Sequence, residues 1–122
     1  MLRLLAVSKR FATRTVLNAV SLAVGPGEYA AIVGESGVGK STLLNIIAGL
    51  EPADSGEVLF ENLNTNDLND DARTVLRREK FGFVFQAFHV LPHLTVLQNV
   101  GLPLLLRGFA QNEIQAKAKN LI

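Results

Sequence analysis

The stretch from Gly34 to Thr42 reads GESGVGKST and fits the pattern G-x-x-x-x-G-K-[ST]. This pattern constrains the fold because such a loop works between a buried strand and the start of a helix. Before it, Tyr29–Val33 is a short apolar run, typical of a strand covered on both faces. After it, apolar residues recur as on one face of a helix, at Leu43, Ile46, Ile47 and Leu50. The sequence therefore predicts a strand–loop–helix unit of an α/β fold.

The composition of this loop is suited to binding phosphate. Glycines at Gly34, Gly37 and Gly39 allow a turn whose backbone N–H groups all face an anion. The helix that begins near Lys40 adds unpaired N–H groups and the positive end of its dipole. The sequence therefore predicts a site for a nucleoside triphosphate.

Each side chain after the glycines has an expected role. Lys40 would reach the β- and γ-phosphates, and the Ser41 hydroxyl would ligate Mg²⁺. Thr42 would support the side of the α-phosphate. The variable positions of the loop are filled by Glu35, Ser36 and Val38.

The rest of the chain alternates between strand and helix patterns. Strands are expected over Leu2–Val7 and Val16–Val24, with the polar stretch Ser8–Thr15 connecting them as a hairpin. A strand follows at Val58–Phe60, then an Asn- and Asp-rich loop over Asn62–Asp71. The remaining expected elements are a short helix around Asp71–Arg78, a strand Phe81–Phe85, a loop His89–His93, a helix from a Thr95 cap to about Leu106, and a helical tail from Gln111.

Composition excludes several classes of function. The 122 residues carry a net charge of +1, which gives no electrostatic reason to expect nucleic acid as the main partner. The chain has no cysteine, so disulfide frameworks and thiolate zinc sites are excluded. No stretch reaches the roughly 20 apolar residues that a membrane-spanning helix needs.

Beyond the loop, the chain resembles the ATP-binding subunits of ABC transporters over almost its full length, and most resembles the branch that serves lipoprotein release and macrolide export. The resemblance is carried by ordered blocks: the loop Gly34–Thr42 with the helix to Leu50, Asp54–Glu57, Phe83–Gln86 with Phe88 and Leu91–Pro92, and Leu94–Val100. It implies ATP and Mg²⁺ as ligands.

The resemblance assigns roles to two further residues. Phe11 stands where an aromatic ring stacks on adenine, although its residue type also suits ordinary packing under a hairpin. Gln86 would hold Mg²⁺ or its water through the side-chain oxygen and would couple nucleotide occupancy to a permease. The less favoured alternative is that Gln86 is a polar residue that ends a strand.

The resemblance also implies partners and a location. A transmembrane permease would dock on the region around residues 87–100, and a second ATP-binding subunit would complete a dimer. The chain would be cytoplasmic and peripheral, on the cytoplasmic face of the inner membrane. His89 and His93 fit surface contacts better than a metal site, because a third ligand is missing. The cations Arg73, Arg77, Arg78 and Lys80 indicate a solvated helix face.

The implied fold is a P-loop NTPase of the ABC ATPase type, with an antiparallel β subdomain and the start of the parallel core and helical subdomain. We expect a partial domain with a β-rich part at 1–33, a phosphate-loop and glutamine-loop core at 34–86, and the start of a helical subdomain at 87–122.

The sequence lacks the family's signature motif, its Asp-Glu pair and its switch histidine, so no catalytic set is complete. We therefore expect a fragment of marginal stability. Two functions remain open: the ATPase subunit of an exporter, or a nucleotide-binding module without turnover. A small P-loop kinase or GTPase is disfavoured because it leaves Gln86 and Thr95–Val100 unexplained.

Overall fold

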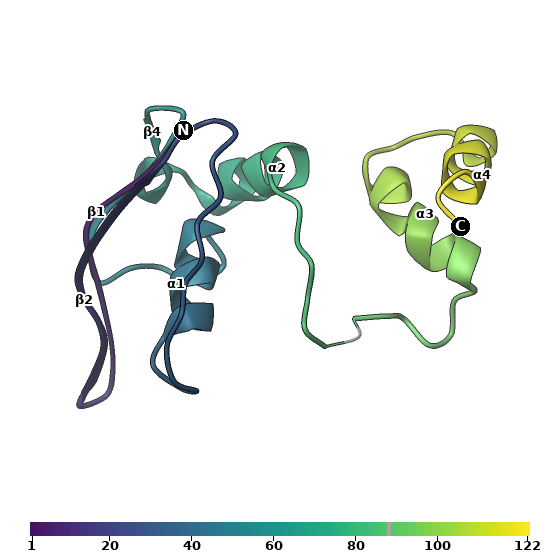
Figure 1. Ribbon diagram of the computed structural model, residues 1–122. Coiled ribbons are helices and arrows are strands. Elements are labelled where there is room, and N and C mark those ends of the chain that lie inside the picture. The colour runs from purple at the N-terminus through teal and green to yellow at the C-terminus, as the bar shows by residue number, and fades with distance from the viewer. Residues whose placement is uncertain (88) are drawn as a thin grey trace. The chain divides into compact units, whose positions relative to one another are not determined.

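The computed structural model describes residues 1–87 and 89–122. They form two compact units, Met1–Gly82 and Phe83–Ile122, and each is described by itself. The first unit holds the sheet with helices α1 and α2, and the second holds helices α3 and α4 (Figure 1). The divisions expected after residues 33 and 86 stay predictions.

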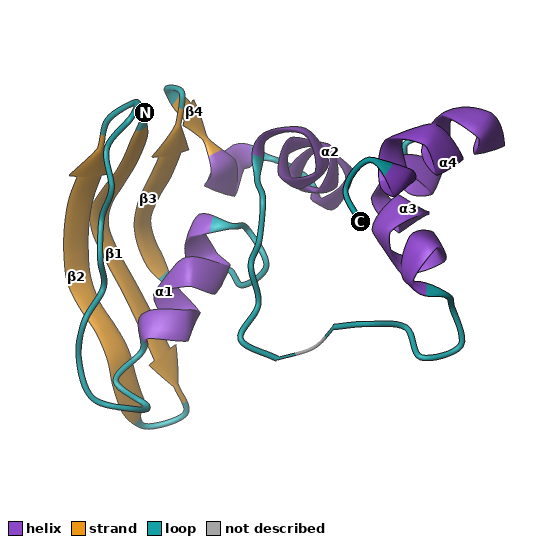
Figure 2. Cartoon of the chain, turned by 45° about the vertical axis from the view of Figure 1, so that its right-hand side comes forward, coloured by secondary structure: helices purple, strands orange, loops and turns teal. Residues whose placement is uncertain are grey.

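The strands of the first unit form one antiparallel sheet in the order β2-β1-β3-β4 (Figure 2). They are β1 (Leu2–Phe11), β2 (Arg14–Val24), β3 (Ser55–Phe60) and β4 (Leu63–Asn64). The strands predicted within residues 2–7, 16–24 and 58–60 are confirmed. The hairpin is also confirmed, but its connection is only Ala12 and Thr13, because polar residues around them continue the strand pairing on the solvated face.

The register of the β1–β2 hairpin shifts at three places, and the first two shifts compensate each other. An extra residue near Ala6 on β1 is balanced by one near Ala19 on β2, and both alanines have left-handed backbones, with φ of 49° and 48°. Each displaced amide N–H donates a hydrogen bond to a serine hydroxyl on the opposite strand. The Ala6 N–H donates to Ser21 Oγ at 2.9 Å, and the Ala19 N–H donates to Ser8 Oγ at 2.9 Å. The strands therefore bend without leaving these amides unpaired.

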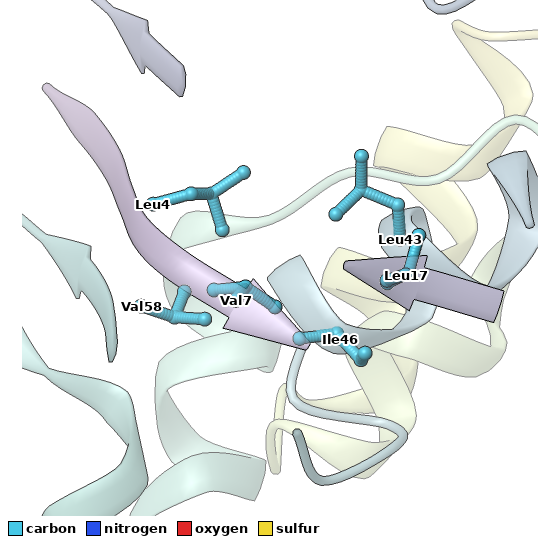
Figure 3. Packing of buried hydrophobic residues seen from close by; sticks show 6 residues of the cluster. All are labelled: Leu4, Val7, Leu17, Leu43, Ile46 and Val58. Atoms are coloured by element: carbon cyan, nitrogen blue, oxygen red, sulfur yellow. The ribbon is translucent and has the colours of Figure 1, made fainter. Parts of the chain in front are cut away.

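Helix α1 (Lys40–Ile47) lies against one face of the sheet (Figure 2). The predicted apolar stripe is confirmed at Leu43 and Ile46, which are buried. Figure 3 shows them in one cluster with four side chains of the sheet: Leu4, Val7, Leu17 and Val58. Leu50 does not belong to the stripe. It is 52% exposed, because the helix has ended and Gly49 turns the chain with φ of 65°.

A buried lysine fastens the segment after α1 to strand β1. Lys9 is only 6% exposed, and its Nζ donates to the Pro52 carbonyl at 2.8 Å. The same Nζ lies 2.8 Å from Glu51 Oε1 and 3.3 Å from Asp54 Oδ1. The hydrogen bond to Glu51 raises the pKa of Lys9. The hydrogen bond from the Arg10 backbone N–H, helped by Lys9, lowers the pKa of Asp54.

Two predicted strands are wrong. Tyr29–Val33 and Phe81–Phe85 have no regular secondary structure, and the Tyr29 and Val33 side chains are exposed. A strand exists only when its backbone groups bond to a neighbour. The sheet of the described residues contains no strand that pairs with either segment. Apolar composition therefore predicted a strand partner that neither segment has among the described residues.

The polar stretch expected as a loop over residues 62–71 is partly ordered. It contains β4, a 3₁₀ helix η1 (Thr65–Asp67) and the first turn of α2 (Asp70–Lys80). Asn69 caps α2 by accepting from the Ala72 N–H at 2.9 Å. The predicted helix is therefore confirmed and begins slightly earlier.

The solvated cation face predicted for α2 is wrong for two arginines. Arg73 Nε donates to the Thr65 carbonyl at 3.1 Å, and Arg77 Nη1 donates to the Gly49 carbonyl at 2.7 Å. Both side chains are half-buried, because their long stems cover apolar surface while their guanidinium groups bond to carbonyls. The other two cations, Arg78 and Lys80, are exposed as expected.

The second unit contains α3 (Val96–Leu106) and α4 (Gln111–Lys119), as predicted. Thr95 and Gln98 form a reciprocal capping box at the start of α3. The two helices pack closely where a Cβ added at Gly101 would lie 2.6 Å from Ile114 Cγ2. Within residues 1–87 and 89–122, no helix has the length and apolar character needed to cross a membrane.

Gly56→Ala should destabilise the first unit because β3 runs close to the β1 bulge. An added Cβ would lie 2.5 Å from the Ala6 carbonyl oxygen, and φ at Gly56 is 89°. Overpacking and backbone strain together should lower the unfolding free energy by at least about 2 kcal/mol. Gly27→Ala is the matched control, since φ is 76° and nothing lies within 4 Å. Equal losses for the two variants in urea unfolding would contradict the close contact.

Asp54→Asn should destabilise the protein in a pH-dependent way. A carboxylate with a lowered pKa stabilises the fold above its ordinary value of 3.8, and this contribution is lost as pH falls through the folded-state pKa. The difference in unfolding free energy between wild type and variant should therefore be largest near neutral pH and shrink as the pH falls below 3.8. Asp71→Asn, at an exposed site, serves as the control. A difference independent of pH would contradict a role for the charge.

Candidate nucleotide-binding site

The phosphate loop joins the end of the Tyr29–Val33 segment to α1. Its glycines have backbone angles that residues with a Cβ rarely adopt, with φ of 153° at Gly34, 77° at Gly37 and 112° at Gly39. Gly39 is also confined by strand β2. A Cβ there would lie 2.6 Å from Val16 Cγ1 and 3.0 Å from the Val16 carbonyl oxygen. The loop is therefore a tight glycine turn seated on the hairpin.

Lys40 folds back into the loop that precedes it. Its Nζ donates to the Gly34 carbonyl at 2.9 Å and to the Glu35 carbonyl at 2.6 Å. The ammonium group thus sits inside the curve of the backbone, on the loop's own oxygen atoms. A positive charge held inside a glycine turn is the arrangement that phosphate oxygens require.

The first turn of α1 presents the remaining predicted residues. Its first helical bond runs from the Leu43 N–H to the Gly39 carbonyl at 2.9 Å, so the three amides before it have no partner within the helix. Ser41 is exposed and Thr42 is half-buried. The variable side chains of the loop, Glu35, Ser36 and Val38, are exposed. The helix start is therefore open to an anion.

The end of the β1–β2 hairpin lies beside this loop. Phe11 is the last residue of β1, its side chain is 46% exposed, and Lys9 Nζ lies 5.3 Å from its ring centroid. Its cross-strand partner Arg14 donates from Nη2 to the Gly37 carbonyl at 3.1 Å. Sequence reasoning missed Lys9 and Arg14. Each contacts residues far along the chain, so only a comparison of co-varying positions could have revealed them.

Gln86 lies in the second unit, where it is exposed at a bend. Its part in the site therefore rests on sequence alone. Near it, the His89 ring packs edge-on against Phe85, with centroids 4.4 Å apart. His93 is exposed in the predicted loop. Phe88, which contributes to the family resemblance, lies outside the described residues.

Asn99 organises the segment between Gln86 and α3. Its Nδ2 donates to three carbonyls, those of Leu91, Leu94 and Thr95, at 3.0–3.1 Å. Its Oδ1 accepts from the Leu91 N–H at 2.8 Å. One side chain thus closes the backbone of residues 91–95 onto the first turn of the helix. Residues 91–95, part of the region expected to face a permease, therefore have a defined backbone shape.

Comparisons with known proteins agree with this fold. The sequence profile described as "ABC transporter" matches residues 17–122. In the solved structures, the chain is similar to the dimeric structure of MJ0796, a bacterial ABC transporter cassette, with a TM-score of 0.90 and 42% identity over 98% of this chain and 55% of that one. The chain belongs to the ABC transporter family.

Relatives of known sequence point the same way. The chain is 43% identical to a probable export ATP-binding/permease protein MacB of Pseudomonas entomophila, over 100% of this chain and 19% of that protein. It is 50% identical to the ABC transporter ATP-binding protein MJ0796 of Methanocaldococcus jannaschii, over 83% of this chain and 44% of the relative. The chain thus spans less than half the length of these two relatives. The predicted likeness to the macrolide-export branch is confirmed, since a Yersinia pestis macrolide export protein MacB is 44% identical.

Asn99→Asp should loosen residues 91–95. The substitution keeps an oxygen for the Leu91 N–H but removes the donor that serves three carbonyls. Lost hydrogen bonds of this kind cost about 1–3 kcal/mol, so hydrogen exchange at the Leu94 amide should accelerate at least about tenfold. Asn112→Asp, at an exposed site in α4, should leave that amide unchanged. Unaltered exchange in Asn99→Asp would contradict the role of the amide.

Proposed function

We propose that this chain binds Mg²⁺-ATP at the loop Gly34–Thr42, as the nucleotide-binding part of an ABC exporter. The observation that carries the proposal is the position of the Lys40 ammonium inside the glycine turn, 2.6–2.9 Å from two loop carbonyls. A triphosphate would take the place of those carbonyls as the partner of the ammonium. A full negative charge is a stronger partner for it than a neutral carbonyl.

The loop and hairpin divide the recognition of the nucleotide between them. Backbone amides from Gly34 to Gly39, with the first turn of α1, would surround the β-phosphate. Lys40 would also reach the γ-phosphate, and Thr42 would bond on the side of the α-phosphate. The exposed ring of Phe11 offers a face on which adenine can stack.

The chain's oxygen donors fit Mg²⁺. The ion prefers a few hard oxygen ligands and keeps several waters, so an exposed hydroxyl at the start of a phosphate-binding helix suits it. Ser41 is such a hydroxyl, and the side-chain oxygen of Gln86 would supply a second ligand or hold a water. When bound, the ion would neutralise charge on the phosphate oxygens.

In the whole protein, turnover of ATP at this site would drive export or release of a substrate at the membrane. Residues 87–100 would face a permease, a second ATP-binding subunit would complete the dimer, and the cassette would sit on the cytoplasmic face of the inner membrane. Support comes from a relative named as an export ATP-binding/permease protein and from a dimeric cassette solved with ADP and Pi, similar at a TM-score of 0.88.

Lys40→Ala should abolish binding of a fluorescent ATP analogue, with at least about a hundredfold rise in Kd. The variant loses the only side-chain cation that lies within the glycine turn in the described structure. Lys80→Ala, which removes an exposed lysine of α2, is the control and should bind as wild type. Far-UV circular dichroism checks that both variants are folded. Equal affinity for Lys40→Ala and wild type would overturn the proposed site.

A further inference from the structure

Arg14 is a second cation at the phosphate loop, and it approaches from outside the turn. Lys40 lies within the curve of the backbone, whereas Arg14 reaches the loop from β2 and donates to the Gly37 carbonyl at 3.1 Å. Gly37 belongs to the exposed part of the loop. Val16, two residues further along β2, packs against Gly39. The hairpin therefore contacts the loop at two neighbouring points.

The charge of Arg14 is available to a ligand. Its side chain is exposed, and in residues 1–87 and 89–122 it forms no ion pair with a carboxylate. A guanidinium has five N–H donors, and the bond to Gly37 uses one of them. The donors that remain form a planar fork, which matches the oxygen atoms of a phosphate.

The hairpin places this charge next to the aromatic ring. Phe11 and Arg14 are direct cross-strand partners on either side of the turn formed by Ala12 and Thr13. Lys9 Nζ lies 5.3 Å from the centroid of this ring, and its ion pairs with Glu51 and Asp54 hold it in place. One rigid hairpin end thus offers a surface for a base and a cation for the phosphates attached to it.

We propose that Arg14 is a phosphate-binding residue of the nucleotide site, holding the loop through Gly37 while its free N–H groups bind the phosphate chain. This inference rests on the proposed function, because it assumes a nucleotide in the loop. It adds a specificity determinant: the affinity gained through Arg14 depends on the number of phosphates, not on the base.

The test compares Arg14→Gln with Arg14→Lys in the full chain. Glutamine keeps an N–H donor for Gly37 but removes the charge, whereas lysine keeps the charge. For Arg14→Gln we expect Kd to rise about tenfold for ATP and about threefold for ADP, with adenosine unchanged. The affinity for ATP should also depend less on salt concentration, since one phosphate contact is lost. Arg14→Lys keeps the charge without the planar fork and should recover part of the ATP affinity.

Two controls separate this proposal from the proposed function. Arg3→Gln removes a half-buried β1 arginine that bonds to Asn62, and it should bind all three ligands as wild type. Lys40→Ala reports on the loop itself. Loss of ATP binding in Lys40→Ala with unchanged binding in Arg14→Gln would overturn the role of Arg14 alone. Equal weakening of ATP, ADP and adenosine by Arg14→Gln would show a merely structural role and would also overturn it.

Discussion

The packing of Leu43 and Ile46 onto the sheet is the contact on which the first unit depends. This packing fixes the position of α1, and therefore the positions of both ends of the helix. The phosphate loop is attached to the start of the helix, while Arg77 bonds to the Gly49 carbonyl just beyond its end. A helix this short is marginal alone in water. Its geometry, and with it that of the loop, is therefore a product of burial against the sheet.

Local patterns in the sequence predicted much of this arrangement. The glycine loop, the apolar positions at Leu43 and Ile46, and the Thr95 cap of α3 each depend on residues within a few positions of one another. Features of this kind can be predicted from a single sequence, because neighbouring residues determine turn angles, helix faces and caps. The same holds for the loop residues of the site, from Gly34 to Thr42.

Three of the failures concern contacts between distant parts of the chain. Tyr29–Val33 has the composition of a buried strand, but composition cannot show whether a pairing neighbour exists. Lys9 looks like a surface lysine until Glu51 and Asp54 are brought to it from beyond α1. Likewise, the contact of Arg14 with the phosphate loop is seen only in the folded structure, where the hairpin lies against Gly37. In each case, a contact with a distant residue, or the lack of one, decided the structure, and the local sequence does not show such contacts.

The paired bulges of the hairpin have a consequence for how the protein meets other proteins. Strand β2 lies at an edge of the described sheet, and a straight edge strand is a template to which another chain can add. The left-handed kink at Ala19 interrupts that template, and the Ser8 hydroxyl has already taken the displaced amide. A foreign strand would therefore find an irregular row of partners there. The bulge at Ala19 thus also helps to protect this edge from aggregation.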